Sequence, residues 1–142
     1  MKTNDDVVRG WVAKARSDLR AMKSTLRAGV PEAAGFHAQQ AAEKMIKAYM
    51  VFRDRDFPFT HDIEKLLEVA ADIEPKFRRF RPSAKILTPY AVDARYSIYF
   101  SPTLAKARIA VRKAEAIVRF VLARLGPLGV ERRRRKARGR KP

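Results

Sequence analysis

Two histidines, His37 and His61, offer most of the chemistry that this sequence of 142 residues contains. Cysteine is absent, so the chain has no thiol nucleophile, disulfide or iron–sulfur cluster. The histidines and acidic residues do not follow the spacing of metal ligands. The sequence also lacks a Walker loop, a GxGxxG pattern and a nucleophile-elbow serine. We therefore expect no metal and no cofactor, and any catalysis would depend on acid–base chemistry.

Arg55 precedes His61 by six residues, in a stretch where Pro58 interrupts the helical pattern. A neutral imidazole can act as a general base, and a guanidinium can neutralise a phosphate. Together they are the minimum parts for metal-free RNA cleavage, in which the ribose 2′-hydroxyl attacks the adjacent phosphate. A symmetric dimer with two Arg–His pairs would supply both the acid and the base. The structural alternative is that His61 caps or packs at a helix start while the arginines are solvated.

A second group of polar residues lies within FHAQQAAEKMIKAYM, a stretch that is apolar on more than one face and is expected to be a central helix. One interpretation is a polar seam that hydrogen-bonds neighbouring helices, with the lysines in solvent. The other is the wall of a cleft or a partner-binding surface. The residues concerned are Gln39, Gln40, Glu43, Lys44 and Lys47.

A third polar group, Asp93, Arg95 and Tyr96, comes near the end of the fourth expected helix. An Asp–Arg pair beside a phenol could line the same cleft as the other polar groups. It could equally be an ion pair that closes the helix. The residue types do not decide between these two roles.

Apolar residues recur at intervals of three and four along almost the whole chain. This periodicity predicts helices over about 8–26, 34–52, 63–73, 80–94 and 104–125, with Asn4 or Asp5, Thr60 and Ser101 as helix caps. Residues 95–101 are the only strand-like stretch, and we interpret them as a connector. The sequence therefore predicts an all-α bundle of about five helices over residues 1–128.

The formal net charge is +17, and it is spread unevenly. Residues 131–142 contain eight basic residues and one acid, which leaves a net +10 on the rest of the chain. We expect residues 129–142 to be a disordered basic tail and the protein to attract polyanions such as RNA. No apolar run approaches the length of a membrane span, and the N-terminus has the acids Asp5 and Asp6 where a signal peptide needs a basic and then an apolar run. We therefore expect a cytoplasmic location without membrane contact.

The order of these motifs resembles the HEPN domain. The resemblance spans residues 5 to about 125 and depends on the combination of QQAAEK, at 39–44, with THDI, at 60–63. It also includes Trp11, the Ala94-Arg95-Tyr96 stretch and an alanine-rich last helix. The name stands for "higher eukaryotes and prokaryotes nucleotide-binding".

The resemblance implies an up-and-down helical bundle that is usually dimeric. Similar prokaryotic members are often paired with a minimal nucleotidyltransferase as toxin and antitoxin, and many are metal-independent ribonucleases. Their signature, an arginine followed after four to six residues by a histidine, is matched by Arg55 and His61. An alternative is a non-catalytic module that binds nucleotide or the nucleotidyltransferase through the polar face of residues 39–47. The arginine-rich tail lies outside the family pattern.

Overall fold

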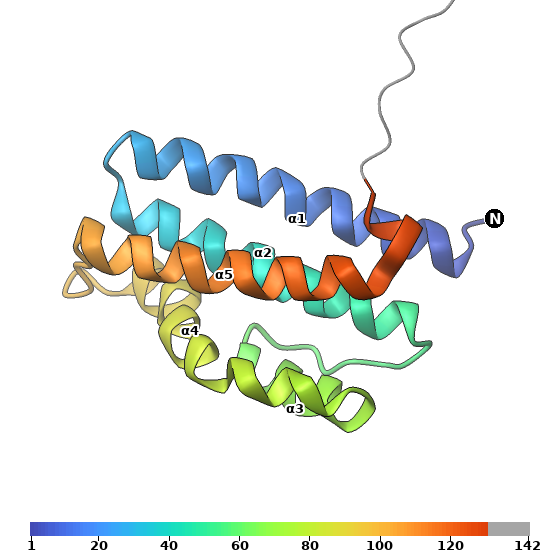
Figure 1. The fold of residues 1–142 in the computed structure, drawn as a ribbon. Coiled ribbons are helices and arrows are strands. Elements are labelled where there is room, and N and C mark those ends of the chain that lie inside the picture. Colours follow the sequence, from blue (N-terminus) through green and yellow to red (C-terminus); the bar gives the residue numbers. More distant parts are fainter. Residues whose placement is uncertain (131–142) are drawn as a thin grey trace, which may run out of the picture.

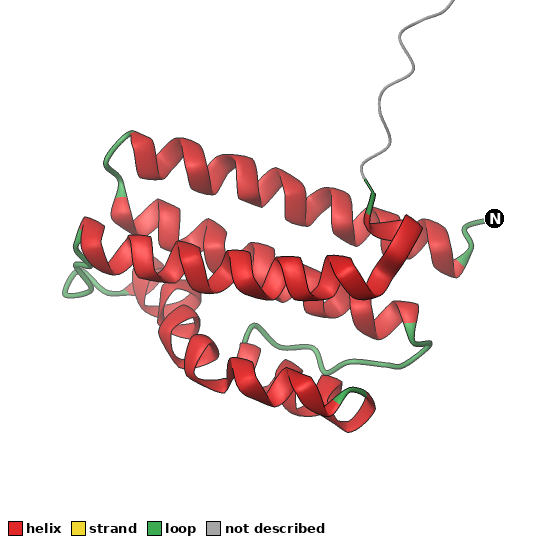
Figure 2. Ribbon diagram, in the orientation of Figure 1, coloured by secondary structure: helices red, strands yellow, loops and turns green. Residues whose placement is uncertain are grey.

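The computed structural model describes residues 1–130, except for the side chains of residues 92–96. The described part is helical, with no strand (Figure 2). Its elements are α1 (Asn4–Arg27), α2 (Pro31–Phe52), α3 (Ile63–Ile73), the 3-10 helix η1 (Pro75–Phe80), α4 (Arg81–Tyr96), α5 (Leu104–Leu125) and the 3-10 helix η2 (Gly126–Gly129). The predicted all-α bundle of about five helices is therefore confirmed.

Helix α2 is the centre of the bundle, as its apolar pattern predicted. It packs against α1, α3, α4 and α5, and α1, α2 and α5 run lengthwise beside one another (Figure 1). Alanines at 38, 41, 42 and 48 are fully buried, and their small side chains let the neighbouring helices approach closely. A helix that must be buried on most sides becomes a rigid support for any polar side chain it carries.

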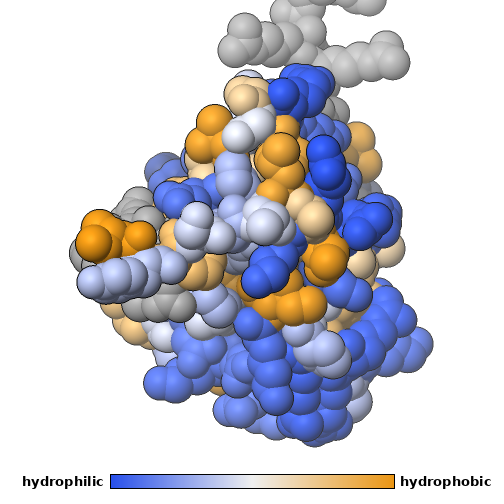
Figure 3. All heavy atoms as spheres, turned by 90° about the vertical axis from the view of Figure 1, so that its left-hand side faces the viewer, coloured by the Kyte–Doolittle hydropathy of each residue, from blue (hydrophilic) through white to orange (hydrophobic). Residues whose placement is uncertain are grey.

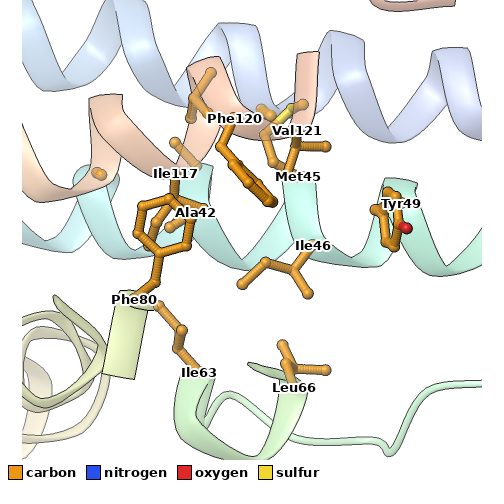
Figure 4. Packing of buried hydrophobic residues seen from close by; sticks show 14 of the residues in the cluster. Ala42, Met45, Ile46, Tyr49, Ile63, Leu66, Phe80, Ile117, Phe120 and Val121 are labelled. Carbon is orange, nitrogen blue, oxygen red and sulfur yellow. The ribbon is translucent and has the colours of Figure 1, made fainter. Parts of the chain in front are cut away.

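The core lies on both sides of α2. Met45, Ile46 and Tyr49 of α2 lie between α5 and the α3–η1 region (Figure 4). Aromatic rings connect these layers, because Phe77 of η1 lies 4.8 Å from Tyr49 and 4.9 Å from Phe120 of α5, measured between ring centroids. This packing fixes α3 and η1 against the central helix.

The predicted helix caps are wrong by one or two residues. Thr3 caps α1 through a reciprocal pair of hydrogen bonds with Asp6, Asp62 caps α3, and Thr103 caps α5. A cap must combine an extended backbone with a side-chain oxygen near the next turn, and the sequence offers several oxygens close together at each start. Thr60 instead accepts a hydrogen bond from the backbone N–H of Asp62.

Residues 97–103 connect α4 to α5 without forming a strand, so the connector predicted for 95–101 begins two residues later, because residues 95 and 96 belong to α4. Ile98 and Tyr99 in this connector are almost fully exposed. At this end of the bundle, hydrophobic side chains form small groups separated by hydrophilic ones (Figure 3). The structure describes η2 and Val130 at the other end of α5, and the expected tail from residue 131 onward lies outside the described residues.

Candidate functional site

The segment between α2 and α3, residues 53–62, begins with a tight reversal at the end of α2. Asp54 has a positive φ of 56°, which aspartate tolerates better than most residues. Its N–H donates to the carbonyl of Val51, and the N–H of Arg55 donates to the carbonyl of Met50. This pair of bonds is a Schellman motif, which satisfies the last carbonyls of α2 and turns the chain back along it.

The reversed segment then runs beside α2 toward its middle (Figure 1). Phe57 packs edge-on against Trp11 of α1, with ring centroids 6.1 Å apart. The ammonium of Lys47 lies 5.6 Å from the Trp11 ring and 5.5 Å from the Phe57 ring. Cation–π attraction of this kind contributes about 0.5–2 kcal/mol. These contacts attach the segment to α1 and α2 before it reaches His61.

His61 is held against α2 by two hydrogen bonds. Its Nδ1 lies 2.9 Å from Oε1 of Glu43, and its backbone carbonyl accepts from Nε2 of Gln39 at 3.0 Å. Glu43 is buried, with 3% of its side chain exposed, whereas 70% of the His61 side chain is exposed. Because Nδ1 faces a carboxylate, the proton of the neutral imidazole is favoured on Nδ1, and Nε2 is free to accept a proton.

The remaining polar residues of α2 surround Glu43. Gln39 and Lys47 both contact its carboxylate at 3.4 Å, and Gln40 donates to the Gln39 side chain at 2.7 Å. Lys47 is buried rather than solvated, and Lys44 is half-buried. The seam interpretation was therefore wrong about the lysines, and the bonds around Glu43 join residues of α2 to one another and to the 53–62 segment rather than to another helix. A buried carboxylate attracts the nearest cation, and Lys47 bends inward to supply it for Glu43.

Arg55 lies at the other end of the 53–62 segment from His61. It lines a shallow pocket of about 260 Å³ with Asn4, Val51 and Phe57 among others, and His61 is not part of that lining. The described residues show no contact between Arg55 and His61. Within one chain, the two predicted catalytic groups thus occupy neighbouring but separate places along α2.

A second carboxylate–histidine pair was not foreseen from the sequence. His37 Nδ1 lies 3.0 Å from Oδ1 of Asp18, whose other oxygen accepts from Lys44 at 2.5 Å. The sequence does contain a signal for it, because Asp18 occurs three residues after the buried Ala15 and four before the buried Met22. An acid on the inner face of a helix requires a partner.

The third polar group of the sequence can be placed only in part. Residues 93, 95 and 96 belong to the last turn of α4. The side chains of Asp93, Arg95 and Tyr96 lie outside the described residues, so their expected role stays a prediction.

The comparison with known families decides the classification. The HEPN domain matches residues 8–125, most of the chain. This chain belongs to the HEPN family. The resemblance read from QQAAEK and THDI is thereby confirmed.

Solved structures agree with the assignment of this HEPN chain. TT1696 from Thermus thermophilus is 29% identical, with a TM-score of 0.68 over 80% of this chain and 94% of that one. ST0689, described as an archaeal HEPN homologue, is 25% identical, with a TM-score of 0.69 over 88% of this chain and 99% of that one. A search of curated proteins gave no match.

Oligomeric state, membrane spans and metal ligands are the remaining features that bear on partners. HEPN domains are commonly dimeric. Among the residues that the structure describes, no helix is both long and apolar enough to cross a bilayer. Within the same residues, no three side chains of His, Asp or Glu gather as ligands for a metal ion.

Proposed function

We propose that this HEPN chain is a metal-independent endoribonuclease, the toxin of a cytoplasmic toxin–antitoxin pair whose other member is a minimal nucleotidyltransferase. The observation that supports it best is the contact between the buried carboxylate of Glu43 and the exposed imidazole of His61. A buried carboxylate that orients a histidine leaves its Nε2 as a positioned base. Further support comes from the spacing of Arg55 and His61, which matches the signature of ribonucleases in this family.

In the proposed reaction, Nε2 of His61 accepts the proton of a ribose 2′-hydroxyl. The freed oxygen attacks the adjacent phosphorus, the bond from phosphorus to the 5′-oxygen breaks, and a 2′,3′-cyclic phosphate forms. Arg55 stabilises the negative charge that develops on the phosphate. The leaving 5′-oxygen needs a proton from a second acid, and solvent water, which reaches the exposed His61 imidazole, would supply it.

The experiment compares His61 and His37, whose Nδ1 atoms are each hydrogen-bonded to a carboxylate. We expect His61→Gln to abolish RNA cleavage and growth inhibition, because the substituted amide cannot take up the 2′-hydroxyl proton. His37→Gln is the matched control. His37 is also held by a carboxylate, but it is not part of the Arg55–His61 signature. Equal cleavage by His61→Gln and wild type, measured on total RNA from the expressing host, would refute the nuclease assignment.

A second candidate function has its own support. Glu43, Gln39 and Lys47 are buried, and both Gln39 and Lys47 donate to the Glu43 carboxylate, as in a purely structural seam. The chain would then be a non-catalytic module that docks a nucleotidyltransferase or binds nucleotide near Gln40 and Lys44. Co-purification with the neighbouring gene product, unaffected by His61→Gln and without RNA cleavage, would favour this module over the nuclease.

A further inference from the structure

A pocket of about 280 Å³ lies on the side of α1 that faces η2. Arg9, Arg16 and Arg20 of α1 line it, and their spacing of seven and four residues puts them on one face of the helix. Leu128 and Val130, at the end of the described chain, contribute apolar lining. The pocket thus combines three guanidinium groups with a small hydrophobic wall.

Within the described residues, no acidic side chain neutralises the positive charge of this pocket. No carboxylate lines it, and none of its three arginines forms an ion pair within the described residues. The guanidinium of Arg16 donates to the carbonyl of Gly129, but its Nε is buried without a hydrogen-bond partner. Arg9 and Arg20 have no carboxylate partner in the described part of the chain, and a bound anion with several oxygens would neutralise them.

The pocket is separate from the Glu43–His61 site. Trp11, which packs against the 53–62 segment, lies on a different face of α1 from Arg9, Arg16 and Arg20. The sequence continues directly from Val130 into residues 131–142, with their eight basic side chains. The strongest concentration of positive charge in the sequence therefore follows Val130, a residue that lines the arginine pocket.

We propose that the pocket lined by Arg9, Arg16 and Arg20 binds a phosphate group of an RNA backbone. Guanidinium groups match phosphate oxygens in charge and in bidentate geometry. The pocket volume of about 280 Å³ far exceeds the roughly 30 Å³ share of one water molecule. The choice of RNA as the source of the phosphate rests on the proposed function, whereas the anion site itself depends only on the pocket.

The experiment measures binding separately from cleavage. A labelled single-stranded RNA is titrated with the full His61→Gln chain by fluorescence anisotropy at several KCl concentrations. We expect the double variant Arg9→Gln/Arg20→Gln, made in that background, to bind more weakly. The slope of log K against log salt should fall by about 0.7, the value for one phosphate that is no longer neutralised. Arg16 is left intact because it holds Gly129, and thermal melts check that the variant is folded.

The matched control removes two arginines elsewhere. Arg108 and Arg112 of α5 are exposed and without an ion pair in the described part of the chain. We expect Arg108→Gln/Arg112→Gln to change the slope less than the pocket variant. An equal decrease in both, or no decrease in the pocket variant, would overturn the proposal.

Inorganic phosphate and adenosine monophosphate form the second arm, with thermal stabilisation as the readout. If either anion stabilises the chain only when the pocket arginines are present, while RNA affinity does not change when they are replaced, the pocket binds an anion but the phosphate does not come from RNA. If RNA binding depends on the pocket but cleavage is absent in the chain with His61 intact, the phosphate site stands and the nuclease proposal fails. The two proposals are therefore tested independently.

Discussion

At the scale of single residues, Glu43 is the side chain on which the candidate site depends. It is buried on the central helix and contacts His61, Gln39 and Lys47. The carboxylate of Glu43 can only accept a hydrogen bond, so it favours the imidazole form with its proton on Nδ1. The orientation and tautomer of the exposed imidazole thus follow from a residue that the solvent does not reach.

We predict that Glu43→Gln lowers RNA cleavage about a hundredfold or more. The glutamine amide can donate to Nδ1, which would favour the tautomer with its proton on Nε2 and block that atom as a base. Cleavage of a defined RNA is the measurement. Asp18→Asn is the matched control, because Asp18 holds His37 in the same way. If both variants lose activity equally, Glu43 is not a specific positioning residue.

At the scale of elements, α2 and α4 approach so closely that one position requires glycine. A Cβ added at Gly35 of α2 would lie 2.1 Å from the ring of Tyr90 on α4. Tyr90 is buried and packs against Phe100 with ring centroids 5.2 Å apart, so its ring has little freedom to move. This contact fixes how α4 crosses the central helix.

We predict that Gly35→Ala destabilises the fold by about 1–3 kcal/mol because it overpacks this crossing. Gly10→Ala is the control, since Gly10 lies inside α1 with no atom within 4 Å of an added Cβ. It should stabilise the chain by up to about 1 kcal/mol through helix propensity. Chemical unfolding measures both changes. Similar effects of the two substitutions would contradict the close contact.

The burial of Tyr90 at this crossing predicts that the free energy of unfolding decreases at alkaline pH. Burial raises the pKa of Tyr90 above its ordinary value of 10, so the folded state holds this proton more tightly than the unfolded state. The contribution is fully present below pH 10 and is lost as pH rises above 10. Unfolding free energies of Tyr90→Phe should therefore decline less steeply between about pH 9 and 11 than those of wild type. Parallel declines would disprove the effect.

At the scale of the whole molecule, the separation of Arg55 from His61 suggests how a dimer would work. Each group lies at a different end of the 53–62 segment, and the two do not share a pocket. HEPN domains are commonly dimeric, and a symmetric dimer repeats both groups across its axis. A complete site could then combine Arg55 of one protomer with His61 of its partner.

We predict that a mixture of Arg55→Ala and His61→Gln chains recovers cleavage, although each alone is inactive. Random exchange gives about half heterodimers, each with one intact composite site, and hence about a quarter of wild-type activity. The measurement is RNA cleavage after the mixed chains have been refolded together. If the mixture stays inactive while mixing with wild type shows that subunits exchange, both groups must act from the same chain.

A second prediction at this scale concerns residues 131–142. Their eight basic side chains should contact phosphates, so deleting them should flatten the salt dependence of RNA binding by about 0.7 for each phosphate that they neutralise. The full chain and a chain ending at Val130 would be titrated with the same RNA. An unchanged slope would show that the basic bundle is the main RNA-binding surface.

The sequence by itself determined the elements and the family of this protein. Periodicity in 34–52 identified α2 and its central position, because apolar residues on several faces require neighbours on several sides. Prolines and glycines limited the helix ends to within a few residues. The motifs QQAAEK and THDI identified the HEPN family, and the spacing of Arg55 and His61 singled out the 53–61 break as the place to look for chemistry.

Only the tertiary structure decided which polar groups meet. Glu43 and His61 are 18 residues apart, and Asp18 and Lys44 are 26 apart. Local spacing carries no information about such pairs, because they depend on how α1 and the 53–62 segment lie against α2. The same holds for the arginine pocket, where the carbonyl of Gly129 reaches Arg16 only after η2 folds back on α1. Periodicity sets which face of a helix is buried, but packing sets what that face touches.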